Sequence, residues 1–218
     1  MSEARAAILS AIRQSLGREE MAASVVTELD RGLREPKSRI LPRVDGDVVE
    51  HFLGRAQVLS MTIARVARRA DVSTAAVDYL TARDLSRKLV VASALKDLQW
   101  PAGIEVRHGA TVREDPVSVT ACFAAIAETG SLVMLSGPET PTTLNFTPDD
   151  MIAVLHRRDI VAHQEEVWQR IRRERKALPR TINLVSGPSR TADIEQVVQL
   201  GVHGPRRVHV ILVEEAAS

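Results

Sequence analysis

The residue types most suited to chemistry are gathered in the segment INLVSGPSRTADIEQVVQLGVHGP, residues 182–205. A short apolar run typical of a strand ends at Ser186, and the turn-forming pair at 187–188 leads into a stretch whose apolar spacing predicts a helix over 191–200. Free N–H groups at the start of a helix favour an anion, and an arginine can bind a carboxylate or phosphate through two hydrogen bonds. The segment therefore predicts an anion site formed by Gly187, Ser189, Arg190 and Thr191.

A purely structural interpretation of the same residues stays open. Ser189 or Thr191 would then cap the predicted helix, because hydroxyl residues are common at helix starts. Arg190 would pair with Asp193 or Glu195, whose negative charges also offset the helix dipole in the first turn. If a cleft lies beside this turn, Asp193 and Glu195 become further candidates for ligand binding.

A histidine follows in the loop GVHGP, residues 201–205. His203 stands between two glycines, so its ring can be presented at a bend with little obstruction from the backbone. A histidine there can relay protons near neutral pH, which makes His203 a candidate catalytic residue. A hydrogen bond from the same ring to a nearby backbone carbonyl is the alternative.

A second constellation occupies the segment AAIAETGSLVMLSGPET, residues 124–140. Glu128 is a candidate catalytic carboxylate, and Thr129 and Gly130 are candidate ligand contacts because the glycine lets the backbone approach a ligand closely. Capping, or pairing with a basic neighbour, is the structural alternative for Glu128. The second SGP, at 136–138, lacks the spacing of a phosphate loop, and no GxGxxG follows a strand, so both standard kinds of nucleotide site are disfavoured.

Composition narrows the function classes. With 29 basic and 28 acidic residues the formal net charge is +1, which provides no general field for nucleic acid. The single cysteine, Cys122, excludes an internal disulfide and a thiol cluster and fits a reducing cytosol. No histidines are paired at HxxxH spacing, and no segment resembles a secretory signal or a membrane span. We therefore expect a cytoplasmic protein without metal, cofactor, nucleic-acid or membrane binding.

The pattern of elements indicates an α/β fold with a mainly parallel, doubly wound sheet. Helical periodicity occupies 3–16, 48–69, 73–83 and 159–176, in addition to 191–200. Short apolar runs typical of buried strands lie at 89–93, 104–108, 131–135, 152–155, 182–186 and 208–213. We expect an N-terminal region, 1–46, made of one helix and a mobile connection over 18–46, followed by an α/β domain over 47–218.

Three of these blocks together resemble one known family. AIAETGS, NLVSGPSRTADIE and LGVHGP are similar to the LUD domain of the lactate-utilisation protein C family, with similarity over about 84–213. The resemblance implies a fold like that of the sugar-phosphate isomerase and CoA-transferase-like superfamily, with a ligand pocket at the carboxyl edge of the sheet. It also implies work with two iron–sulfur subunits in the oxidation of L-lactate to pyruvate. This chain would be the cluster-free component, because it lacks the cysteines of the iron–sulfur members.

The sequence leaves three functions open and does not decide whether the chain is an enzyme by itself. In the first, Ser189, Arg190 and Thr191 bind a small organic acid, while Glu128 and His203 manage protons. In the second, the chain is a non-catalytic scaffold whose N-terminal helix and basic stretch at 170–180 dock an iron–sulfur subunit. In the third, Glu128 is the nucleophile of an acyl or CoA transferase-like enzyme. A homo-oligomer is compatible with each of them.

Overall fold

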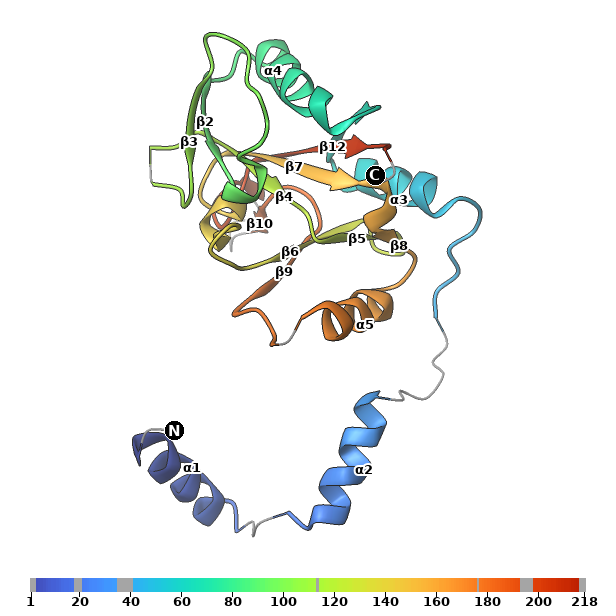
Figure 1. Ribbon diagram of the computed structural model, residues 1–218, viewed down its shortest axis with the longest axis vertical. Helices are drawn as coiled ribbons and strands as arrows, with labels where there is room; N and C mark the ends of the chain where they lie inside the picture. Colours follow the sequence, from blue (N-terminus) through green and yellow to red (C-terminus); the bar gives the residue numbers. More distant parts are fainter. Residues whose placement is uncertain are drawn as a thin grey trace. The chain divides into compact units, whose positions relative to one another are not determined.

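The computed structural model describes residues 3–17, 21–34, 41–112, 114–175, 177–192 and 198–215. The chain divides into two units, residues 1–41 and 42–218. The first unit contains two helices, α1 (Glu3–Ser15) and α2 (Ala23–Arg34) (Figure 1). The helix predicted over 3–16 is confirmed, whereas the mobile connection predicted over 18–46 is wrong where α2 lies. No helix in the described ranges has the length and apolar character needed to cross a membrane.

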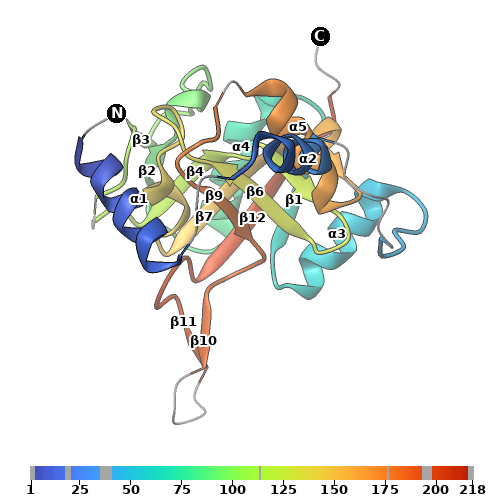
Figure 2. The ribbon, with the colours of Figure 1, turned by 90° about the horizontal axis from the view of Figure 1, so that it is seen from below.

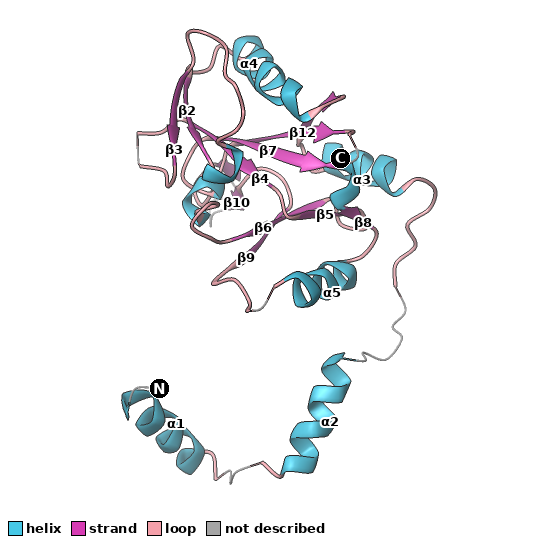
Figure 3. Ribbon diagram, viewed as in Figure 1, coloured by secondary structure: helices cyan, strands magenta, loops and turns pink. Residues whose placement is uncertain are grey.

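The second unit is built on a six-stranded sheet in which every neighbouring pair of strands is parallel (Figures 1 and 3). Its strands, in spatial order, are β1 (Thr62–Val66), β12 (Arg207–Val213), β7 (Asp150–His156), β4 (Val117–Ala121), β2 (Lys88–Val91) and β3 (Glu105–His108). The α/β fold with a mainly parallel sheet is therefore confirmed.

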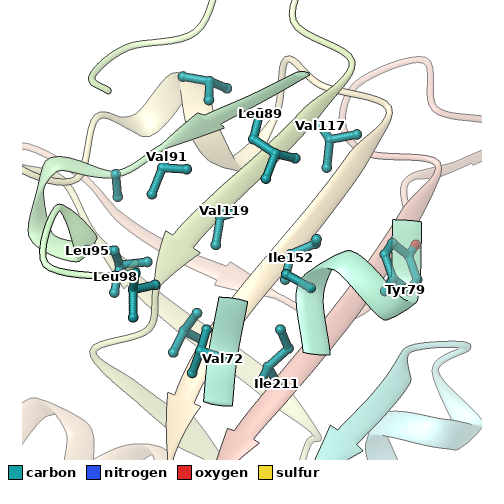
Figure 4. Packing of buried hydrophobic residues seen from close by; sticks show 14 of the residues in the cluster. Val72, Tyr79, Leu89, Val91, Leu95, Leu98, Val117, Val119, Ile152 and Ile211 are labelled. Atoms are coloured by element: carbon teal, nitrogen blue, oxygen red, sulfur yellow. The ribbon is translucent and has the colours of Figure 1, made fainter. Parts of the chain in front are cut away.

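Helix α4 (Val72–Ala82) covers one face of this sheet. Figure 4 shows Val72 of the helix near Ile152 and Ile211, which come from adjacent strands of the sheet. Successive strand residues point to opposite faces, so Ile152 of β7 belongs to this cluster while its neighbours Met151 and Ala153 belong to the cluster on the other side. Two-sided burial explains why the central strands β7 and β12 are apolar over most of their length rather than alternating with polar residues.

The opposite face is covered by helix α3 (Val48–Val58) and by a second, four-stranded sheet. That sheet contains β8 (Ile160–Val161), β5 (Ala124–Ile126), β6 (Ser131–Leu135) and β9 (Ile182–Val185), in this spatial order. Helix α5 (Gln164–Glu174) packs on the far side of it through Val167 and Ile171. The second sheet was not predicted, because a short buried strand has the same apolar pattern in either sheet.

Two predicted helices need correction. The helix predicted over 48–69 ends at Val58, and the chain turns at Ser60, whose φ of 65° is left-handed, before it continues as β1. The helix predicted over 191–200 is wrong, because β10 (Arg190–Ala192) and β11 (Val198–Leu200) form an antiparallel hairpin that projects from the rest of the unit (Figure 2). Asp193 and Glu195 lie outside the described residues.

Candidate functional site: an arginine-lined cavity

The turn after β9 is held against the end of α3 by a glycine. Gly187 has φ +97°, and a Cβ there would stand 2.3 Å from the backbone oxygen of Leu59, so a larger residue would clash with the backbone. This close approach places the following residues beside the turn between α3 and β1. There the guanidinium of Arg190 donates a hydrogen bond to the Ser60 hydroxyl. Arg190 is therefore positioned by the tight packing of Gly187 on Leu59, and not by the start of a helix as the sequence had predicted.

The two motifs on which the family resemblance depends meet at the base of the β10–β11 hairpin. The Ser189 N–H donates to the Pro205 carbonyl at 2.8 Å, and the Gly201 N–H donates to the Ser189 carbonyl at 3.1 Å. The backbone N–H of His203 lies 3.4 Å from the Ser189 hydroxyl, and the His203 residue is exposed. These bonds tie 187–190 to 201–205, and they close the hairpin in place of the predicted helix. The catalytic role of His203 stays a prediction.

A cavity of about 320 Å³ opens beside this turn. The residues that line it are Ser60, Thr62, Arg83, Pro188, Arg190, Arg206, Arg207 and Val208. Thr62 begins β1 and Arg207 begins β12, so the cavity lies at the amino ends of the parallel strands. A ligand pocket was expected at the carboxyl edge of the parallel sheet. For the segment 187–190 that expectation is wrong, because this segment follows β9, which belongs to the second sheet. Four of the eight lining residues are arginines, and none is a carboxylate.

One arginine of the cavity is already neutralised by a buried carboxylate. Arg207 donates two hydrogen bonds of 2.6 Å to Asp150, which is 2% exposed and also accepts a hydrogen bond of 3.0 Å from the Tyr79 hydroxyl. The bond to Asp150 raises the pKa of Arg207, and burial, followed by the charge of Asp150, raises the pKa of Tyr79. A bidentate pair with a third donor fixes the Arg207 guanidinium in one orientation.

The other three arginines are less compensated. Arg206 lies 3.3 Å from Asp149, and both side chains are more than half exposed, so solvent weakens their attraction. Arg83 stands over the Tyr79 ring, 5.2 Å from its centroid. Within the described part of the chain, neither Arg83 nor Arg190 is paired with a carboxylate. The cavity therefore carries an excess of positive charge, which suits an anionic ligand.

A buried histidine lies behind the cavity. His209 is 5% exposed, stacks on Tyr79 with ring centroids 4.1 Å apart, and places Nδ1 2.8 Å from the Thr62 hydroxyl. Burial, and secondly the charge of Arg83, lowers the pKa of His209 to about 4. The ring is consequently neutral at physiological pH and adds no charge to the cavity.

Sequence reasoning singled out Arg190 but missed the other arginines of this cavity. Arg206 and Arg207 directly follow the GVHGP loop, and this adjacency was an available signal. No such signal in the sequence pointed to Arg83, at the end of α4. Only the fold brings Arg83 beside Arg190 and Arg206, which lie more than 100 positions later in the chain.

The Glu128 constellation lies apart from this cavity and makes structural contacts. One carboxylate oxygen of Glu128 is 2.9 Å from His163 Nδ1, and the other accepts the Gln164 N–H at 2.9 Å in the first turn of α5. Thr129 and Ser131 share a hydrogen bond of 2.8 Å between their hydroxyls. Both oxygens of Glu128 are thus engaged, which favours the capping interpretation, and its catalytic role stays a prediction.

Gly130 is required by packing. Its φ is +74°, and a Cβ would stand 2.8 Å from the Cβ of Arg55 on α3. Gly130 and Gly187 therefore both bring the second sheet against the end of α3, and their part in ligand binding stays a prediction. The described residues contain no group of three or more His, Cys, Asp or Glu side chains placed to hold a metal ion.

A larger cavity, of about 430 Å³, lies at the carboxyl end of β4. It is lined by the second SGP turn and by Cys122, Asp159 and Arg170, and by none of the predicted site residues. Arg170 is paired with Asp159 at 2.8 Å and with Glu174 at 3.1 Å. Burial, and then the charge of Asp159, raises the pKa of the Cys122 thiol, so the thiol stays protonated. Arg175 also lines the cavity and stands 5.7 Å from the centroid of the Phe123 ring, but the carboxylates of Glu139 and Asp159 in the lining balance the charges of Arg170 and Arg175. The cavity therefore has no excess of positive charge among its described lining residues, and it offers no thiolate nucleophile.

Comparison with known proteins agrees with the resemblance seen in the motifs. The model of the LUD domain matches residues 116–213. Lactate utilization protein C from an Exiguobacterium strain is 32% identical over 114 residues, which are 51% of this chain and 49% of the relative. The protein of the same name from Halalkalibacterium halodurans is 33% identical over 102 residues, which are 45% of this chain and 44% of the relative. The chain thus matches about half the length of these relatives.

The fold has a solved counterpart. The crystal structure of a DUF162 family protein from Deinococcus radiodurans superposes with a TM-score of 0.59 over 79% of this chain and 99% of the other, at 21% identity. That likeness concerns the fold alone. The LUD-domain match and the relatives' sequences lead to a conclusion about part of the chain: residues 116–213 are similar to the LUD domain.

Proposed function

We propose that this chain takes part in lactate utilisation as a cluster-free component that holds a small organic anion in the arginine-lined cavity. The names of its relatives support a role in lactate utilisation, and the arginines that line the cavity support an anionic ligand. The observation that carries the proposal is the pair Arg83 and Arg190, which face the cavity without a carboxylate partner in the described structure. Iron–sulfur subunits would carry the electrons as L-lactate is oxidised to pyruvate.

The size of the cavity fits a small ligand. Its volume of about 320 Å³ is at the lower end of the range of about 300–1,000 Å³ that is usual for ligand sites. A planar guanidinium can contact both oxygens of one carboxylate, so a single arginine can orient a small acid. The neutral His209 behind the cavity leaves the arginines as the source of its charge.

The test is lactate-dependent reduction of an electron acceptor by the purified chain, with and without its iron–sulfur partners. We expect activity only in the mixture, and we expect Arg190→Ala to lower that activity by about tenfold or more, as for loss of a charged hydrogen-bond partner. Arg172→Ala, which removes an exposed arginine of α5, is the matched control. Full activity of the Arg190→Ala mixture, with an unchanged circular dichroism spectrum, would contradict the proposal.

A scaffold role is favoured by a separate observation on the first unit. Helices α1 and α2 have apolar rows at helical spacing that the first unit does not itself bury: Ile8, Leu9, Ile12, Val25, Val26, Leu29 and Leu33. Such rows are typical of helices that pack on a partner. Removal of residues 1–41 should then abolish co-purification with an iron–sulfur subunit while anion binding by the second unit persists. Retained association would exclude this role for the helices.

A further inference from the structure

We propose that the ligand of the arginine-lined cavity is a dianion, with the charge of a phosphate group or a dicarboxylate, and is not a monocarboxylate such as lactate. This inference rests on the proposed anion site and specifies the class of its ligand. It begins with the charges. The cavity has four guanidiniums, and two carboxylates of the described chain, Asp149 and Asp150, are paired with them. Two positive charges remain uncompensated.

The uncompensated charges come from separate elements. Arg83 follows α4, and Arg190 begins β10. Both residues are exposed, so each side chain can reorient toward a ligand. A monocarboxylate satisfies one guanidinium through a bidentate contact and leaves the second without a counter-charge. A group with two negative charges can engage both, and it gains a charge-assisted hydrogen bond from each.

The neutral groups of the cavity also fit an oxyanion. Ser60 accepts a hydrogen bond from Arg190, and its own hydroxyl proton is available for a ligand oxygen. Thr62 adds a second hydroxyl, hydrogen-bonded to the neutral ring of His209. No Asp or Glu is among the described residues that line the cavity, so nothing in the lining repels a second negative charge. The lining therefore consists largely of donors.

The buried carboxylate sets the limit on the charge of the ligand. Asp150 is 2% exposed and accepts two hydrogen bonds of 2.6 Å from Arg207 and one of 3.0 Å from Tyr79, so a ligand cannot displace it easily. Arg207 therefore has a fixed place in the wall of the cavity, but Asp150 neutralises its charge. Arg206 lies 3.3 Å from Asp149, so the charges left for the ligand are those of Arg83 and Arg190, which is consistent with two negative charges on the ligand.

The experiment is calorimetric titration of the full chain with inorganic phosphate, sulfate, malonate and L-lactate at one ionic strength and pH 7.5. We expect the three dianions to bind at least about tenfold more tightly than lactate, the gain expected for one further charged hydrogen-bond contact. Arg83→Ala and Arg190→Ala should each remove most of that preference, whereas Arg172→Ala should leave it intact. Arg83→Gln and Arg190→Gln, which remove the charge but keep a long polar side chain, replace any alanine variant that fails to fold.

The outcomes separate the two proposals. If lactate binds as tightly as phosphate and depends on Arg190, the dianion inference is wrong while the anion site stands. If no anion binds, or if Arg172→Ala weakens binding as much as Arg190→Ala, both are wrong. If phosphate and sulfate bind but malonate does not, the dianion is a phosphate-type group; if malonate binds most tightly, it is a dicarboxylate.

Discussion

Two cavities of the α/β unit, one at each end of the parallel strands, differ in how their arginines are compensated. At the carboxyl end of β4, Arg170 is held between two carboxylates, at 2.8 Å from Asp159 and 3.1 Å from Glu174. At the amino ends of β1 and β12, Arg83 and Arg190 have no carboxylate partner in the described structure, although the cavity is smaller. Cavity volume alone would not select the arginine-lined cavity, and its assignment as the proposed anion site rests on the charge balance of the lining.

The comparison also separates two uses of arginine. Arg170 and Arg207 stabilise the fold, because each is bound to a carboxylate that is buried or nearly so. Arg83 and Arg190 make no such pair within the described residues. Each guanidinium can therefore form an ion pair with an anionic ligand without breaking an existing ion pair.

Changing the glycine that positions Arg190 should have the largest effect. In Gly187→Ala the new Cβ would meet the Leu59 backbone oxygen at 2.3 Å in a left-handed conformation, so we expect a loss of about 3–5 kcal/mol in the free energy of unfolding. Gly46→Ala is the matched control: it has a left-handed φ of +76° but open space around it, and it should cost about 1 kcal/mol. Urea denaturation of both variants measures the difference, and equal losses would refute the role of the close contact.

The buried histidine behind the cavity should make stability depend on pH. The folded chain lowers the pKa of His209 from 6.5 to about 4, so between these values the unfolded chain binds a proton that the folded chain does not. Stability should therefore fall as the pH falls from 6.5 to 4, by up to about 3 kcal/mol from this group, with no further loss from it below pH 4. His209→Gln should flatten this part of the profile in urea titrations. An unchanged slope in the variant would show that other groups cause the loss.

A change at the larger cavity should have the smallest effect and would sharpen the comparison. Asp159→Asn removes one of the two carboxylates that hold Arg170, so the lining gains positive charge. We expect weak new phosphate binding there, worth about 1 kcal/mol or less because Glu174 remains paired. Phosphate titration of Asp159→Asn combined with Arg190→Ala isolates this site. Tight binding in the double variant would mean that the charge balance does not distinguish the two cavities.

The sequence predicted those parts of the site that are contiguous in the chain. The strand, the turn at 187–188 and Arg190 lie within nine residues, and their local pattern was sufficient to identify them. Arg83 and Ser60 join the cavity only through the packing of α3 and α4 on the sheet, which no local pattern records. The helix predicted over 191–200 was wrong because the backbone bonds of Ser189 to Pro205 and Gly201, which close the hairpin, connect segments that a periodicity window treats separately.

The most direct test of the account is the phosphate dissociation constant of two matched variants, Arg190→Ala and Arg170→Ala, each of which removes one arginine from one cavity. The charge balance predicts that Arg190→Ala weakens phosphate binding by about tenfold or more, and that Arg170→Ala leaves it unchanged. Equal affinities in the two variants, or a loss confined to Arg170→Ala, would contradict the assignment of the anion site to the arginine-lined cavity.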